Sequence, residues 1–228
     1  MAVPGPISSR VALYFRDRVE AGRRLASRLE KLDLQDAVAL GLPRGGVVIA
    51  YEVAKALDIP LDVIVVRKLG VPYQPELAMG AIGEDGVRVL DARVIRAAGV
   101  NEAQIRMVED RERVELARRA VEFRRGRDRL DLNGATALVI DDGIATGSTA
   151  RAATEVVRKL GARKVVVAAP VASPEAVRLL SNIADEVVCL AAPAGFLSIG
   201  EFYGDFSPTS DAQVVSLLSQ GGSAPSTA

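Results

Sequence analysis

The chain contains 228 residues, with 29 basic and 29 acidic side chains, one cysteine and no histidine. The absence of histidine excludes Ser-His-Asp and Cys-His catalysis and the zinc sites that use histidine. A net charge of zero, with no tryptophan, argues against nucleic acid as a partner.

The amino-terminal segment, residues 1–18, lacks the apolar core of a signal peptide, and no stretch approaches the length of a membrane span. We therefore expect a cytoplasmic protein that does not contact membranes.

Short apolar runs alternate with helical patterns along most of the chain. The predicted strands are 37–41, 61–66, 135–140, 165–169 and 186–190. The predicted helices are 16–31, 47–57, 149–160, 174–182 and a short one near 212–218. This alternation predicts an α/β fold, with a Rossmann-like open parallel sheet flanked by helices.

Residues 69–130 depart from the alternation. A stretch rich in Gly and Pro, 69–86, predicts a flexible loop, and it precedes a short strand and a charged helix over 102–125. The apolar stripe predicted to be the packed edge of this helix contains Met107, Val114, Ala117 and Val121. Residues 88–129 hold twelve arginines against eight acidic residues, which form either a solvated face or a basic rim that attracts a phosphorylated substrate.

The sequence LVIDDGIATGSTA, residues 138–150, carries the clearest chemical signal. Asp141 and Asp142 follow an apolar strand, at the edge of an open α/β sheet where ligands bind. Adjacent carboxylates can accept hydrogen bonds from vicinal hydroxyl groups or hold a divalent cation through water. A phosphate cradle at a helix amino terminus is predicted for Ala145, Thr146, Gly147, Ser148 and Thr149. The combination predicts a ribose 5-phosphate site; the alternative is an Asp-Gly turn whose hydroxyls only cap a helix.

This stretch resembles the phosphoribosyl pyrophosphate (PRPP) binding motif of type I phosphoribosyltransferases. The resemblance implies that Asp141 and Asp142 bind the ribose hydroxyls, that the loop binds the 5-phosphate, and that Mg²⁺ bridges PRPP oxygens near the acidic pair. It also implies a PRPP-binding core over 34–192, with an insertion at about 69–130. The other implied parts are a small hood formed by 1–33 with 193–219, and a disordered tail over 220–228.

The resemblance assigns further residues to the leaving pyrophosphate. They are Arg44, Gly45 and Gly46, which follow the first strand and Pro43, and Arg67 and Lys68, which follow the second. Catalytic roles are expected for Lys68, Arg44 and Glu76, the last in the loop that closes over the site. Aromatic residues of the hood, Phe202, Tyr203 and Phe206, form either a wall for a base or an anchor for the carboxyl-terminal loop.

The activity implied is transfer of the 5-phosphoribosyl group from PRPP to an acceptor nitrogen, expected to belong to a nucleobase, with release of pyrophosphate. Ala145 stands where the 6-oxopurine branch has an aspartate, so adenine or uracil fits better than a 6-oxopurine. Mg²⁺ is the expected cofactor and a homodimer the expected assembly. A PRPP- or nucleotide-sensing regulator without catalysis is the alternative. A phosphatase is disfavoured because the acidic pair lacks the usual spacing, and the P-loop, dinucleotide and esterase motifs are absent.

Overall fold

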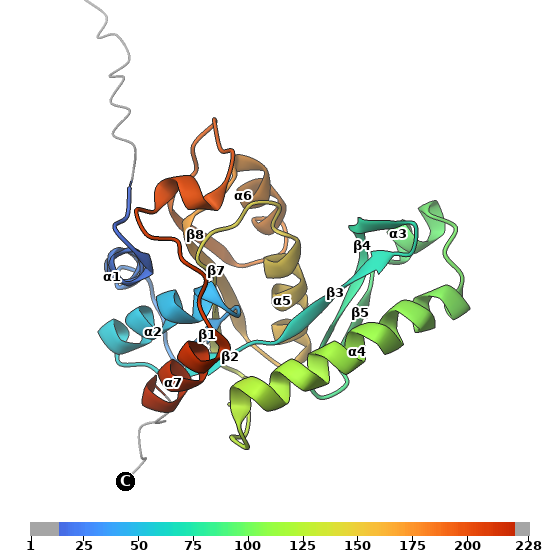
Figure 1. Ribbon diagram of the computed structural model, residues 1–228, viewed down its shortest axis with the longest axis horizontal. Helices are drawn as coiled ribbons and strands as arrows, with labels where there is room; N and C mark the ends of the chain where they lie inside the picture. Colours follow the sequence, from blue (N-terminus) through green and yellow to red (C-terminus); the bar gives the residue numbers. More distant parts are fainter. Residues whose placement is uncertain (1–13, 222–228) are drawn as a thin grey trace, which may run out of the picture.

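A five-stranded parallel sheet forms the centre of the computed structural model, which describes residues 14–221 (Figure 1). The strand order is β2-β1-β6-β7-β8, and all four neighbouring pairs are parallel. The strands are β1 (Ala37–Gly41), β2 (Leu61–Val63), β6 (Thr136–Ile140), β7 (Lys164–Val171) and β8 (Glu186–Ala191). The predicted Rossmann-like open parallel sheet is therefore confirmed.

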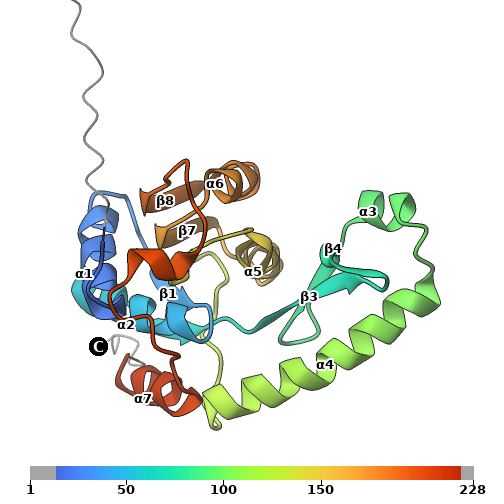
Figure 2. The ribbon, with the colours of Figure 1, turned by 45° about the horizontal axis from the view of Figure 1, so that its top comes forward.

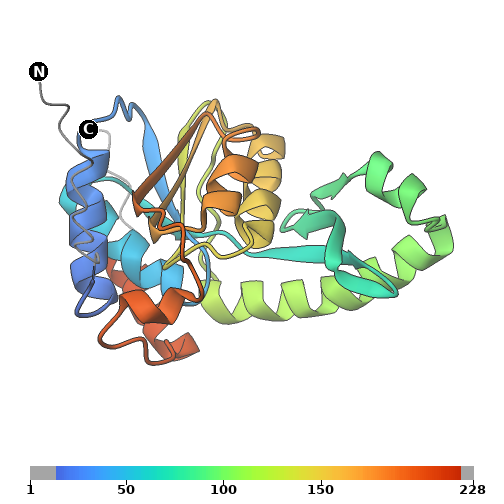
Figure 3. The same cartoon turned by 90° about the horizontal axis from the view of Figure 1, so that it is seen from above.

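Helices cover both faces of this sheet, which explains why its strands are mostly apolar (Figure 3). Ala39 and Leu138 pack on one face, and Leu40 and Val139 pack on the other. The first face is covered by α1 (Arg18–Leu29), α2 (Gly45–Leu57) and α7 (Asp211–Gly221), and the second by α5 (Ser148–Lys159) and α6 (Pro174–Leu180). Four of the strands, β1, β6, β7 and β8, thus contribute to two separate cores, whereas β2 contributes to the first alone.

Helix starts follow the capping signals of the sequence. Ser173 caps α6, because its Oγ accepts a hydrogen bond from the Ala176 N–H at 3.0 Å. Ser210 and Gln213 exchange the two hydrogen bonds of a capping box before α7. Helix α7 extends through 220–221, which corrects the start of the predicted tail; 222–228 and residues 1–13 of the predicted hood lie outside the described residues. None of the helices between residues 14 and 221 has both the length and the apolar character needed to cross a bilayer.

The insertion between β2 and β6 is a separate layered unit (Figure 2). It contains an antiparallel sheet and two helices: β3 (Val66–Val71), β4 (Gln74–Gly83), β5 (Arg88–Leu90), α3 (Ala92–Ala97) and α4 (Glu102–Arg124). The predicted strand 61–66 is wrong at its end, because Val66 already pairs with Gly83 in the second sheet.

The prediction of a flexible loop over 69–86 is also wrong, because most of this stretch forms the β3–β4 hairpin. Its glycines serve close packing. A Cβ atom on Gly70 would lie 2.4 Å from the Pro75 carbonyl oxygen, and one on Gly80 would lie 2.3 Å from that of Val89. Both contacts are too short for any side chain, so glycine here permits the strands to approach each other.

Helix α4 packs on a different face from the one its apolar stripe predicts. Met107, Val114 and Val121 are 62%, 73% and 74% exposed, whereas Ile105 and Leu116 are buried. The buried face also contains Glu109 and Glu112, which accept hydrogen bonds from arginines. The prediction failed because paired glutamates replace apolar residues on the packed side.

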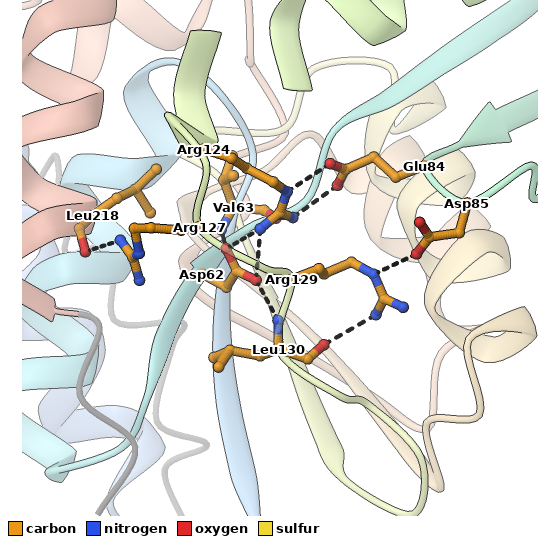
Figure 4. Close-up of polar contacts among 9 residues, drawn as sticks. All are labelled: Asp62, Val63, Glu84, Asp85, Arg124, Arg127, Arg129, Leu130 and Leu218. Atoms are coloured by element: carbon orange, nitrogen blue, oxygen red, sulfur yellow. Dashed lines mark hydrogen bonds and ion pairs between the residues drawn. The ribbon is translucent and has the colours of Figure 1, made fainter. Parts of the chain in front are cut away.

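The carboxyl-terminal end of α4 is fastened to the core by Arg124 (Figure 4). The guanidinium donates to both carboxylate oxygens of Asp62, at 2.8 and 3.0 Å, and to both of Glu84, at 2.6 and 2.8 Å. It also donates to the Val63 carbonyl at 3.0 Å. Asp62 lies on β2 and Glu84 follows β4, so one buried cation joins the main sheet, the hairpin and α4.

Candidate functional site

A cleft of about 460 Å³ lies between the core and the insertion. The core contributes Leu42, Pro43 and Thr149, and the insertion contributes Lys68 and Arg111 among others. Figure 2 shows the insertion standing beside α5, and Leu42 and Pro43 of the lining directly follow β1. The cleft therefore opens where the parallel strands end, which is the usual ligand edge of such a sheet.

The acidic pair lies directly after β6. Asp141 N–H donates to the Ala168 carbonyl of β7 at 3.1 Å, and Asp142 N–H donates to Asp141 Oδ1 at 2.9 Å. Burial, and then the charge of Asp142, raise the pKa of the Asp141 carboxyl well above its usual range. The charged form of the Asp141 carboxyl is therefore disfavoured where it lies.

Asp142 has a partner on α1 that the sequence did not predict. Arg18 on α1 donates from Nε to Asp142 Oδ2 at 2.7 Å, and it also donates to the Ser207 carbonyl at 2.9 Å. The ring of Phe206 lies 4.0 Å from the Arg18 guanidinium carbon. No local pattern marks Arg18, because the pair joins positions 124 residues apart.

The predicted phosphate cradle lies at the amino terminus of α5. Gly147 precedes the helix with φ +76°. Because glycine has no side chain, it cannot cap the first N–H groups of the helix. Thr146 Oγ1 accepts a hydrogen bond from Ser148 N–H at 3.3 Å, and the Ala145 carbonyl accepts one from Ser173 at 2.6 Å. The loop is thus held in place while its helix end faces outward, which suits an anion.

The predicted pyrophosphate loop contacts the acidic pair. A Cβ atom on Gly45 would lie 1.9 Å from Asp142 Oδ2, and one on Gly46 would lie 2.6 Å from the Ile140 carbonyl oxygen. The peptide bond between Pro43 and Arg44 is cis. Arg44 lies 3.8 Å from Asp211 of α7, measured from Nη1 to Oδ1. Two segments that are distant in sequence are therefore in contact because glycine allows it.

Arg67, Lys68 and Glu76 all line the cleft, but from the hairpin of the insertion. Lys68 Nζ lies 3.1 Å from Glu76 Oε2, and the Glu76 side chain is 92% exposed. Arg67 pairs with Glu112 of α4. Sequence reasoning did not select the α4 residues of this wall, Arg111, Glu112 and Arg119, because their helix is separated from the hairpin in the chain.

The hood aromatics lie away from the cleft lining. Tyr203 is 5% exposed, and its ring lies 5.4 Å from that of Phe15 and 4.9 Å from that of Phe206. Its hydroxyl donates to the Asp142 carbonyl at 2.6 Å. Phe202 stacks with Phe196 at 5.8 Å. The structure thus places Tyr203 and Phe206 in an anchor that holds the carboxyl-terminal loop beside Asp142. None of the three predicted base-binding residues lines the cleft, and neither do Asp141 and Asp142.

Three comparisons relate the chain to known proteins. A family model described as the phosphoribosyl transferase domain matches residues 16–198. Two proteins from strains of Mycobacterium tuberculosis, each named provisionally as a phosphoribosyl transferase, are 56% identical over 204 residues, which make up 90% of this chain and 46% of theirs. This chain thus spans about half the length of those relatives. The crystal structure of TT1426 from Thermus thermophilus is 44% identical with a TM-score of 0.87, covering 92% of this chain and 100% of that one.

Proposed function

The chain belongs to the phosphoribosyl transferase domain family, and on that premise we propose that the carboxyl edge of its parallel sheet, beside the cleft, binds PRPP and that the protein transfers the 5-phosphoribosyl group to an acceptor nitrogen, releasing pyrophosphate. One observation carries the proposal. The acidic pair, the amino terminus of α5 and the loop before α2 converge at the carboxyl edge of one parallel sheet. Their donors and acceptors match a sugar diol, a phosphate and a diphosphate.

The chain's own residues would bind and orient the substrate. The N–H groups of 145–149 bind the 5-phosphate, and the carboxyl groups of Asp141 and Asp142 meet the ribose hydroxyls. Arg18 supports this role because it keeps one carboxylate of the pair in place. As the bond to pyrophosphate breaks, negative charge grows on the leaving group, where Arg44 and Lys68 stabilise it.

The oxygen donors at this edge fit Mg²⁺. Magnesium prefers carboxylate, phosphate and water oxygens, and it usually keeps several substrate or water ligands. Asp141 and Asp142 supply carboxylate oxygens, although Arg18 already engages Asp142. We therefore assign most of the metal ligands to PRPP and water, with the acidic pair nearby. When bound, the ion would neutralise charge on the diphosphate.

A PRPP-sensing regulator is the second candidate. It is favoured by the ion pair between Lys68 and Glu76, which engages a group that the transferase uses to stabilise the leaving pyrophosphate. This pair must rearrange or share its partners for the transfer reaction. A nucleobase acceptor, a homodimer and a cytoplasmic location remain predictions.

Pyrophosphate release separates the two candidates. The full chain is incubated with PRPP, Mg²⁺ and each of a panel of free bases that includes adenine, hypoxanthine and uracil. We expect release with at least one acceptor, and its loss in the double variant Asp141→Asn, Asp142→Asn. PRPP binding without release on every acceptor supports the sensor and refutes the transferase proposal.

A further inference from the structure

The insertion side of the cleft carries a cluster of three charged residues, Arg67, Glu112 and Arg111. Glu112 lies on α4 and is only 8% exposed. Its Oε2 lies 2.8 Å from Nε and 2.6 Å from Nη2 of Arg67. Its Oε1 lies 3.2 Å from Nε and 3.0 Å from Nη2 of Arg111. One buried carboxylate therefore holds two guanidinium groups in defined positions.

The Arg67–Glu112–Arg111 cluster retains a positive charge. Burial would raise the pKa of Glu112, but hydrogen bonds and charge from Arg67 and then Arg111 outweigh it and lower this pKa. Glu112 is therefore ionised near neutral pH, and it offsets only one of the two guanidinium charges. Each guanidinium has five N–H donors, of which Glu112 engages a part, and both arginines line the cleft.

The remaining lining of the cleft adds to this charge. Lys68 and Arg119 bring the cationic side chains to four, against the two carboxylates of Glu76 and Glu112. The 5-phosphate segment, 145–149, and the loop at 43–46 lie on the core. Lys68 is assigned to the diphosphate and Arg67 is shared with it, so Arg111 and Arg119 are the two cations of the cleft lining that the proposed function leaves unassigned.

Apolar groups surround the cluster. Val71, Pro72 and Pro75 of the hairpin and Met107 of α4 line the same cleft. A ligand that fits has an apolar or planar body, which these side chains cover, and an anionic group, which the two arginines bind. Paired arginines are suited to carboxylates because each guanidinium can donate two parallel hydrogen bonds.

We propose that the Arg67–Glu112–Arg111 cluster binds an anionic group of the acceptor, so that the acceptor is a small molecule carrying a carboxylate or a comparable anion. This inference rests on the proposed function, because only a transferase has an acceptor. It narrows the acceptor to small molecules that carry an anionic group. Arg111 makes the direct contact, because its side chain is 75% exposed. Glu112 is a positioning residue that acts through the two arginines.

Matched pairs of compounds test the inference. Orotate is compared with uracil, and nicotinate with nicotinamide, in calorimetric titrations of the full chain saturated with ribose 5-phosphate. No transfer occurs because ribose 5-phosphate has no pyrophosphate to lose. We expect the acid of at least one pair to bind about tenfold tighter than its neutral partner, as two charge-assisted hydrogen bonds would give. Arg111→Ala should reduce this preference to about twofold or less.

Two further variants test whether the Arg67–Glu112–Arg111 cluster causes the preference for acids. Glu112→Gln removes a negative charge, so simple long-range attraction predicts stronger binding of the acids, whereas our inference predicts a weaker acid preference because the arginines lose their anchor. Arg113→Ala is the matched control on α4, since Arg113 pairs with Glu109 and does not line the cleft. Thermal melting confirms that each variant is folded.

The inference is overturned if acids bind no better than neutral compounds, if nothing binds, or if Arg111→Ala keeps the preference. It is also overturned if Glu112→Gln strengthens it. The proposed function fails on a different measurement, the absence of pyrophosphate release from PRPP with every acceptor. If acids bind preferentially but no pyrophosphate is released, the cleft binds anions and the protein is not a transferase.

Discussion

Replacing Arg124 by methionine tests the attachment of the insertion to the core. Methionine approximates the aliphatic length of arginine but removes its charge and all its hydrogen bonds. The variant leaves the carboxylates of Asp62 and Glu84 facing each other, with side chains only 5% and 10% exposed. Two buried negative charges then lack their common partner (Figure 4).

The expected cost follows from the contacts of Arg124. Five hydrogen bonds at 2.6–3.0 Å are lost, and each charge-assisted bond is worth roughly 1.5–3 kcal/mol. Their sum overstates the loss, because folding also had to desolvate the guanidinium. Removing one partner of a buried ion pair typically lowers the free energy of unfolding by about 3–5 kcal/mol, and we expect this range for Arg124→Met.

A triple variant serves as the control for unpaired charge. Arg124→Met combined with Asp62→Asn and Glu84→Gln removes the two carboxylates as well, so it should be more stable than Arg124→Met alone. Urea unfolding followed by circular dichroism measures the free energy of unfolding of both variants. The comparison holds when the two variants show the same dependence of this free energy on urea concentration. A loss smaller than about 1 kcal/mol in the single variant, or equal losses in both, would show that Arg124 does not hold two otherwise unpaired buried charges.

Three further predictions concern the site and the surface. Gly45→Ala should weaken PRPP binding about tenfold or more, because its Cβ would lie 1.9 Å from Asp142 Oδ2; Gly195→Ala, which meets nothing within 4 Å, should bind as wild type in the same titration. Tyr203→Phe leaves the Asp142 carbonyl without its donor and should lower the unfolding free energy by roughly 1–3 kcal/mol in urea; an unchanged midpoint would show that water replaces the hydroxyl. Hydrogen bonds from Arg118 and Arg119 lower the pKa of Glu115 from 4.5 to about 2, so its contribution to stability is present above pH 4.5 and is lost as the pH falls toward 2. The melting temperature should therefore fall less steeply over that range in Glu115→Gln than in wild type, and parallel curves would contradict this.

Local patterns in the sequence were sufficient for the core of the fold. Four of the five strands of the main sheet are apolar on both faces, and the helix starts at Ser173 and Ser210 carry side chains that cap them. The motif at 138–150 placed two carboxylates and a helix amino terminus at one edge of the sheet, as the structure has them. These features depend on neighbouring residues, which a sequence displays directly.

The insertion could not be predicted in the same way, because long-range pairing determines it. Gly70 and Gly80 indicate flexibility in isolation but permit strand contact in the hairpin. Glu112 has the sequence context of an ordinary surface residue until Arg67, 45 positions earlier, is brought beside it. Arg18 and Asp142 are a second pair that is distant in the chain and is brought together by the fold. Charged residues that find partners across the fold reverse the faces that hydrophobic periodicity assigns to α4.

Calorimetric titration of the full chain with PRPP in the presence of Mg²⁺ tests the central claim most directly. We expect saturable binding to wild type that is lost in the double variant Asp141→Asn, Asp142→Asn, while the melting transition remains cooperative. Equal affinity of the two proteins for PRPP would contradict the assignment of the site at the end of β6.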